Sequence, residues 1–154
     1  MAYDFSEEGL QRFYLLGAWI KFLAAHEWCL YCHLTFPSRS RKVSANRSFD
    51  VWIHDLNRRM FGHRYWKRGI VGISWARGSE RQERGDVHFH ALLGNCKIIT
   101  PEHAEERWKK ITKGGNAKIE IFDASKKGIE YIVKNHANIE VSKTLTTSAP
   151  ALKA

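Results

Sequence analysis

The chain has 154 residues, of which 44% are hydrophobic and 12% aromatic, and its formal net charge at pH 7 is +9. This length and composition predict a folded domain with a hydrophobic core and argue against an intrinsically disordered chain. There is no apolar run long enough to span a bilayer, the N-terminus is acidic and unlike a signal peptide, and three cysteines occur without an export signal. We therefore expect a cytoplasmic protein, or a nuclear one in a eukaryotic virus, with no membrane partner.

Helices and strands are expected to alternate along the chain. The expected elements are, in order, a helix (6–26), a strand (28–37), a loop (38–48), a helix (49–62), a strand (68–78), a turn (79–86), a strand (87–94), a helix (100–115), a strand (116–123) and a helix (124–137). Ser6 and Thr100 are the expected N-caps, Pro101 occupies a first helical position, and Gly62 ends the second helix.

The short connection in the middle of the chain sets the fold class. Strands 68–78 and 87–94 are joined by so few residues that they must form an antiparallel hairpin. Strands and helices interspersed around a hairpin predict an α+β fold, in which helices pack on an antiparallel sheet. We expect one domain over residues 1–137, with residues 138–154 as a loosely ordered tail or the stub of a linker, because they show no clear periodicity.

Positive charge is concentrated in the middle of the sequence. Residues 37–86 hold twelve basic and five acidic side chains, a net charge of +7. Such an excess is typical of a protein that binds a polyanion, most often a nucleic acid. It is equally typical of a basic surface that only keeps the protein in solution, so charge alone leaves both interpretations open.

The strand "VHFHALLG" carries two histidines on one face. Alternate residues of a strand share a face, so one face carries His88, His90 and Leu92, and the other carries Val87, Phe89, Ala91 and Leu93. The second set is apolar throughout and should pack against helices. The two imidazoles of the first set could converge on one cation, since imidazole is the commonest nitrogen ligand for a metal. They could also be hydrogen-bonded histidines in a half-exposed sheet.

Carboxylates near these histidines could complete a metal site. The turn before the strand contains Glu80, Glu83 and Asp86. If the turn centres near Arg84, Glu80 lies directly across from His88 on the partner strand, and directly opposed residues point to the same face. A set of two histidines and one carboxylate leaves positions open on the metal, as in catalytic rather than structural sites.

The last predicted helix places a tyrosine away from its apolar face. At 100° per residue the core-facing stripe consists of Ile129, Ile132, Val133 and His136, and the opposite side carries Lys127, Tyr131 and Lys134. A phenol beside an ammonium group could act as a nucleophile, because the positive charge favours phenolate. An exposed tyrosine on a basic helical face is the alternative.

Three motifs in this order resemble those of the HUH-superfamily rolling-circle replication initiators, of the single-tyrosine type. They are "LTFP" (34–37), "HFHALL" (88–93) and "YIVK" (131–134), and the stretch "ERQERGDVHFH" before the histidine pair is also similar to phage and plasmid members. The similarity spans roughly residues 28–136. Each motif is weak by itself, but the three together, on strand, strand and helix, form a specific pattern.

The resemblance implies a five-stranded antiparallel sheet and a metal-dependent nickase and ligase that acts on single-stranded DNA at a replication origin. By similarity, His88, His90 and Glu80 would hold Mg²⁺ or Mn²⁺. Tyr131 would attack the scissile phosphate, leaving a 5′-phosphotyrosine and a free 3′-hydroxyl, and Lys134 would assist. The chain contains no P-loop motif, so a helicase would be supplied by another domain or protein.

Basic and aromatic residues are the expected contacts to single-stranded DNA. In initiators of this type, the DNA that they contact lies at an origin hairpin. The candidate phosphate contacts are Arg39, Arg41, Lys42, Arg47, Lys67, Arg68 and Lys127. Tyr65, Trp66 and Trp75 are candidates for stacking on bases, although the core is the more common place for a tryptophan.

Three other functions fit parts of the pattern. A single-tyrosine transposase of the same superfamily would cleave transposon ends rather than an origin-like hairpin. A histidine-dependent nucleotide hydrolase would need a third histidine at the position of Leu92, and would form no covalent adduct with DNA. A non-catalytic nucleic-acid-binding module with an RRM-like sheet would bind without metal and never cleave.

Overall fold

The computed structural model describes residues 4–37, 42–81, 86–135 and 138–146, with the backbone alone at residues 42, 43, 81 and 146. Its strands are β1 (Leu30–Leu34), β2 (Ser74–Arg81), β3 (Val87–Gly94), β4 (Ala117–Ile121) and β5 (Ile139–Val141). Its helices are α1 (Glu7–Ala24), α2 (Lys42–Phe61), α3 (Pro101–Ile111), α4 (Gly128–Asn135) and α5 (Lys143–Thr146), with short 3₁₀ helices η1 (Tyr65–Arg68) and η2 (Ala124–Lys126).

The five strands form one sheet in the order β4-β1-β3-β2-β5, and every pairing is antiparallel. The expected α+β fold with a five-stranded antiparallel sheet is therefore confirmed. The central strand β3 is buried along its whole length, between β1 and β2. The hairpin predicted from the short connection is the β2–β3 pair.

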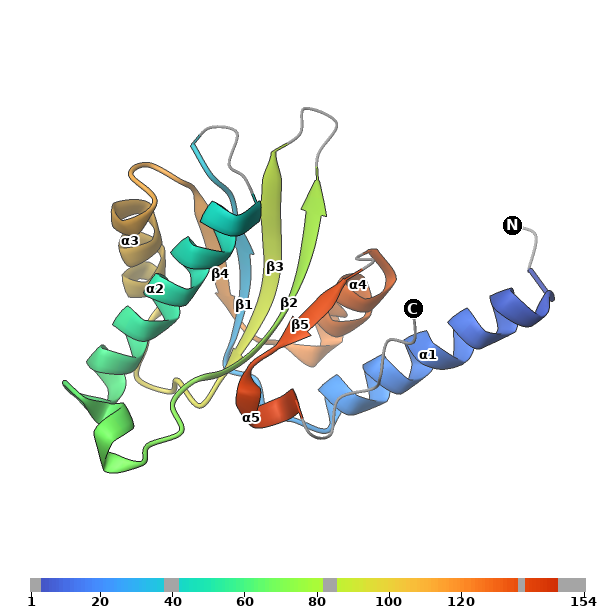
Figure 1. Ribbon diagram of the computed structural model, residues 1–154, viewed down its shortest axis with the longest axis horizontal. Helices are drawn as coiled ribbons and strands as arrows, with labels where there is room; N and C mark the ends of the chain where they lie inside the picture. Colours follow the sequence, from blue (N-terminus) through green and yellow to red (C-terminus); the bar gives the residue numbers. More distant parts are fainter. Residues whose placement is uncertain (1–3, 38–41, 82–85, 136–137, 147–154) are drawn as a thin grey trace.

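The two faces of the sheet are covered by different helices (Figure 1), with α2 and α3 on one side and α1 and α4 on the other. The apolar residues expected to pack against helices lie on the α2 and α3 side, where Phe89 and Leu93 join Trp52 and Trp108 in one core. A second, smaller core forms on the other face, where Leu92 of β3 contacts the layer of α1 and α4. The histidines of β3 therefore point toward the α4 side.

Several element boundaries differ from the sequence prediction, and the largest differences are at the start of α2 and the start of β2. Helix α2 begins at Lys42 rather than at residue 49, because Ala45 and Phe49 continue its buried face despite the polar composition of that stretch. Strand β2 begins at Ser74 rather than at residue 68. Gly69 and Gly72 adopt positive φ angles of 71° and 84°, a conformation outside the extended region that a strand requires.

The chain after residue 137 belongs to the fold, so the prediction of a loosely ordered tail from residue 138 is wrong over the described residues 138–146. Strand β5 pairs with β2 at the edge of the sheet. Ile139 and Leu145 are 8% and 6% exposed, respectively, and both join the core on the α1 and α4 side. Three-residue strands carry too little periodicity to be recognised in a sequence. The remaining predicted tail, 147–154, lies outside the described residues.

Substituting Ile139 tests this boundary. We expect Ile139→Ala to lower the free energy of unfolding by about 2–4 kcal/mol, because it removes a buried side chain from the core. A loosely ordered tail would give no change. Urea denaturation measures the difference, and Val71→Ala serves as the control, since Val71 is 69% exposed and its truncation should change stability by less than about 0.5 kcal/mol.

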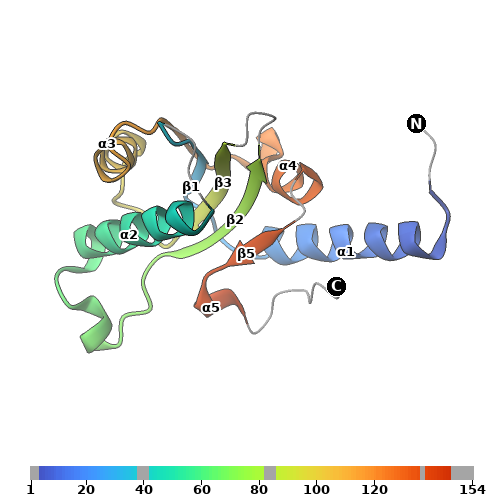
Figure 2. The ribbon, with the colours of Figure 1, turned by 45° about the horizontal axis from the view of Figure 1, so that its top comes forward.

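Helix α1 begins as expected, with the Ser6 side chain accepting a hydrogen bond from the Gly9 amide. Its C-terminal half packs on the domain through Trp19 and Leu23. Figure 2 shows the rest of the helix extending beyond the sheet, where Tyr14 is 72% exposed. In the described part of the chain, none of the helices is both long and apolar enough to cross a membrane.

Candidate metal and nucleophile site

The β2–β3 register places a carboxylate beside the histidines. Glu80 pairs directly with His88, as the sequence predicted, and its Oε2 lies 3.0 Å from His88 Nε2. Both histidines are buried, with exposed fractions of 6% and 7% for His88 and His90, whereas the Glu80 side chain is 41% exposed. Gly78 pairs with His90 and has no side chain, so it leaves room beside this imidazole.

A third histidine, which sequence reasoning missed, completes the cluster. His33 of β1 pairs directly with His90, and their rings stack with centroids 4.4 Å apart and planes 11° apart. One ligand atom from each of His33, His88 and His90 lies within 4.8 Å of the others. His33 stands immediately before "LTFP" in the sequence. The signal that could have found it is its position in the strand that leads into this motif, which pairs antiparallel with the strand of His88 and His90.

These residues fit a metal ion. Histidine nitrogens bind Zn²⁺ at about 2.0–2.1 Å, so three ring nitrogens within 4.8 Å of one another could share one ion after moving closer together. His33 Nε2 and His88 Nδ1 are buried and have no hydrogen-bond partner within the described residues. Burial, with a further contribution from His88, lowers the pKa of His33, which keeps this imidazole neutral at pH 7 and its lone pair available. The cluster could therefore hold a metal ion.

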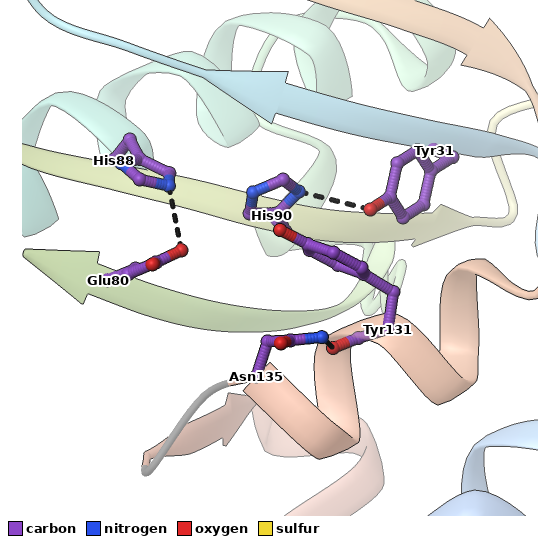
Figure 3. Close-up of polar contacts among 6 residues, drawn as sticks. All are labelled: Tyr31, Glu80, His88, His90, Tyr131 and Asn135. Carbon is purple, nitrogen blue, oxygen red and sulfur yellow. Dashed lines mark hydrogen bonds and ion pairs between the residues drawn. The ribbon is translucent and has the colours of Figure 1, made fainter. Parts of the chain in front are cut away.

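Tyr31 orients the ring of His90. Its hydroxyl lies 3.0 Å from His90 Nδ1, and Figure 3 shows the other ring nitrogen of His90 pointing toward His88. Metal-binding histidines usually donate their second N–H to an oxygen acceptor, which fixes the tautomer that ligates. Burial, with a smaller contribution from Tyr131, raises the pKa of Tyr31 to about 12. Tyr31 is therefore a neutral phenol at physiological pH.

Helix α4 brings Tyr131 to the histidines. Ile129, Ile132 and Val133 are buried, which confirms the predicted core stripe at these positions; His136 lies outside the described residues. Tyr131 is 44% exposed, its ring centroid lies 4.9 Å from that of His90, and its hydroxyl points toward the histidine cluster in Figure 3.

A close approach at the start of α4 makes this placement possible. A Cβ atom on Gly128 would lie 2.9 Å from the Tyr31 ring, closer than two carbon atoms can pack. The absence of a side chain at residue 128 therefore lets the first turn of α4 rest on Tyr31. Tyr131 follows within the same turn and extends over His90.

Lysines border this site on two elements. Lys127 is exposed and its carbonyl accepts the amide N–H of Tyr131 at 3.0 Å, and Lys134 is exposed one turn after Tyr131. Lys118 of β4, which sequence reasoning did not select, pairs directly with His33 and is exposed. The positive charge beside the site thus comes from the C-terminal part of the chain.

The structure does not gather the other predicted phosphate contacts at this site. Lys67 and Arg68 lie in η1, at the end of α2 away from the start of β3 in Figures 1 and 2. Arg47 is exposed on α2, which covers the opposite face of the sheet. Arg39 and Arg41 lie outside the described residues, as does the side chain of Lys42.

The aromatic candidates also lie elsewhere. Trp75 packs on the α2 side of the sheet, with its ring centroid 5.0 Å from that of Phe49, so it stacks in the core rather than beside the histidines. Tyr65 and Trp66 belong to η1 and contact His54 of α2. Their place in the fold separates them from Tyr131.

The site combines three imidazoles, one carboxylate and a half-exposed phenol on one face of the sheet. This arrangement could hold a divalent cation and present a nucleophile to an electrophile bound beside that cation. We compared the chain with models of protein families, with curated proteins and with solved structures, and none of them matched.

Proposed function

We propose that this protein is a metal-dependent, site-specific nickase and ligase of single-stranded DNA, which initiates rolling-circle replication through a 5′-phosphotyrosine intermediate. The observation that carries the proposal is the position of the Tyr131 ring, 4.9 Å from His90. Tyr131 and the histidines belong to different sequence motifs, and only the fold brings them together. A tyrosine exposed by chance on a basic helix would not be expected to point at a cluster of three imidazoles, two of them buried.

The residues available for the metal are His88, His90 and Glu80, with His33 in addition. Imidazole nitrogen suits transition metals, whereas Mg²⁺ prefers oxygen ligands in octahedral geometry. The three histidines of the cluster therefore favour Mn²⁺ over Mg²⁺. When bound, such a cation supplies positive charge that stabilises the charge developing on the phosphate oxygens.

Tyr131 supplies the nucleophile in this proposal. Its phenolic oxygen forms a bond to phosphorus, and the bond between phosphorus and the 3′ oxygen breaks. The phenol loses one proton and the departing 3′ oxygen gains one. The 5′ phosphate stays on Tyr131, so the products are a phosphotyrosine and a free 3′-hydroxyl, and the reverse reaction rejoins DNA without ATP because the phosphoester bond is conserved.

The lysines contribute charge at two points. Lys134 is exposed on the same helix as Tyr131, one turn away, and its ammonium group would offset negative charge on the attacked phosphate. Lys127 and Lys118 border the site and suit DNA phosphates on either side of the attacked one. These roles come from placement beside Tyr131 and His33 rather than from overall charge.

A covalent adduct tests the proposal directly. The protein is incubated with a random pool of single-stranded oligonucleotides and Mn²⁺, and the products are separated on a denaturing gel. We expect a protein–DNA adduct that forms with Mn²⁺ and is absent when EDTA removes the metal. Binding of DNA without any adduct would contradict the proposal and favour the non-catalytic binding module.

Two predicted phosphate contacts can be compared, because the structure places only one of them beside Tyr131. Affinity for single-stranded DNA should fall with salt concentration by a log–log slope of about −0.7 per neutralised phosphate. We expect Lys127→Ala to reduce the magnitude of that slope by about 0.7, and Lys67→Ala to leave it unchanged. Fluorescence anisotropy over a salt series measures both, and equal effects of the two substitutions would contradict this assignment.

A further inference from the structure

A cavity lies directly beside the proposed nucleophile. Its volume is about 190 Å³, and it is enclosed by strands β1 and β4 and by the chain leading into α4. The residues that matter for its chemistry are Tyr31, Glu120, Phe122, Asp123, Lys126 and Tyr131. We call this cavity the base pocket, because we assign to it the binding of a DNA base.

We propose that the base pocket binds one unstacked base of single-stranded DNA, next to the phosphate that Tyr131 attacks, and that it selects a base with an exocyclic amino group. This inference rests on the proposed function, because it takes single-stranded DNA as the substrate. The base pocket would select the base at one position of the DNA strand, a selectivity that neither the metal nor the nucleophile provides.

The size and place of the pocket suit a single base. Pockets for drug-sized ligands have volumes of about 300–1,000 Å³, so about 190 Å³ accommodates one heterocyclic ring system and excludes a base pair. Tyr131 forms part of its wall while the Tyr131 hydroxyl points at the histidines. A phosphate at that hydroxyl would therefore have the base of an adjacent nucleotide within reach of the pocket.

Aromatic rings provide the walls on which a base could stack. Tyr31 is held from two sides, by its hydrogen bond to His90 and by the close approach of Gly128, so its ring is already in position before DNA binds. Phe122 is partly buried and also lines the pocket. Stacking on such rings strengthens binding without choosing a base, because every base has a π face.

Two carboxylates give the pocket its selectivity. Glu120 pairs directly with Tyr31 and therefore points to the same face of the sheet. Asp123 Oδ1 accepts hydrogen bonds from the amide and hydroxyl of Ser125 at 2.9 and 2.7 Å, which fixes the carboxylate in place. Lys126 Nζ lies 3.8 Å from Glu120 Oε2, so one ammonium group faces two carboxylates and the pocket keeps a net negative charge.

This charge determines which part of a nucleotide enters. A net negative pocket repels phosphate and admits the neutral base. Ionised carboxylates only accept hydrogen bonds, and cytosine, adenine and guanine each offer an exocyclic amino group as donor. Thymine offers carbonyl oxygens and a methyl group around its single N–H, so Glu120 would disfavour it.

The base preference is measured both in the strands that the protein retains and in the strands that it captures covalently. A random single-stranded pool is incubated with the protein and Mn²⁺, and both the retained strands and the covalently captured strands are sequenced. We expect a preference for amino-bearing bases over thymine at one position, adjacent to the nick in the captured strands. In Glu120→Gln, which keeps the shape of the side chain, that preference should fall about tenfold, the effect of losing one charge-assisted hydrogen bond.

Glu106→Gln, on the exposed side of α3, is the matched control and should leave the preference unchanged. Adducts whose base preference is the same in wild type and Glu120→Gln would overturn the base pocket and leave the nickase proposal standing. A preference in the retained strands that depends on Glu120, without any adduct, would support the pocket and contradict the nickase. A protein that retains no DNA would overturn both.

Discussion

Tyr131→Phe should abolish the covalent protein–DNA adduct while leaving the protein folded. The substitution removes only the phenolic oxygen, and the side chain is 44% exposed, away from the buried stripe of α4. Without that oxygen the phosphate has no nucleophile on α4, and loss of a covalent nucleophile removes the adduct entirely rather than slowing its formation. Denaturing electrophoresis detects the adduct, and circular dichroism confirms the fold.

Tyr14→Phe is the matched control, because Tyr14 is exposed on α1 and the same atom is removed far from the histidines. The sharper comparison is Tyr31→Phe, since Tyr31 is the other phenol that contacts His90. We expect that variant to form the adduct more slowly, through disturbed orientation of His90. Adduct formation that survives in Tyr131→Phe and disappears in Tyr31→Phe would move the nucleophile to Tyr31.

The sequence predicted the local geometry of the site well. Glu80 faces His88 because a hairpin with a short turn permits few registers, and strand alternation then determines the face. Tyr131 lies off the core stripe of α4 because helical periodicity assigns its apolar residues to the opposite side. Both predictions use residues that are close together in the chain.

His33 and Lys118 were not predicted, because they reach the site through contacts between residues that are far apart in the chain. Both reach the site through pairings with strands that are distant in sequence, β1 with β3 and β1 with β4. An isolated strand with a polar residue in its centre does not reveal its neighbours. Lys67 and Arg68 lie away from the histidines. A high density of positive charge in the sequence does not show which end of the fold carries it.

The remaining large effect concerns the metal, where the structure extends the predicted set of ligands. Losing the hydrogen-bond partner of a metal ligand costs roughly 10–100-fold in metal affinity. We expect His33→Phe to reduce Mn²⁺ affinity by more than this, because it removes a ligand itself. Phenylalanine keeps a ring to stack on His90 but supplies no nitrogen. Glu80→Ala should weaken binding in the same range, because it removes the anionic ligand beside His88. Isothermal titration calorimetry of the metal-free protein measures both without reference to DNA.

His54→Phe provides the matched control, since His54 lies on α2, is exposed, and contacts Tyr65 rather than the cluster. Glu83→Ala should also lose little affinity, because Glu80 is the carboxylate that the register brings to His88. Unchanged affinity in His33→Phe, with strong loss in Glu80→Ala, would restrict the ligands to Glu80, His88 and His90. The reverse result would leave the three imidazoles as the ligands. Because His33 lies on β1, the choice between these outcomes decides whether β1, the strand that leads into "LTFP", belongs to the metal centre or only supports it.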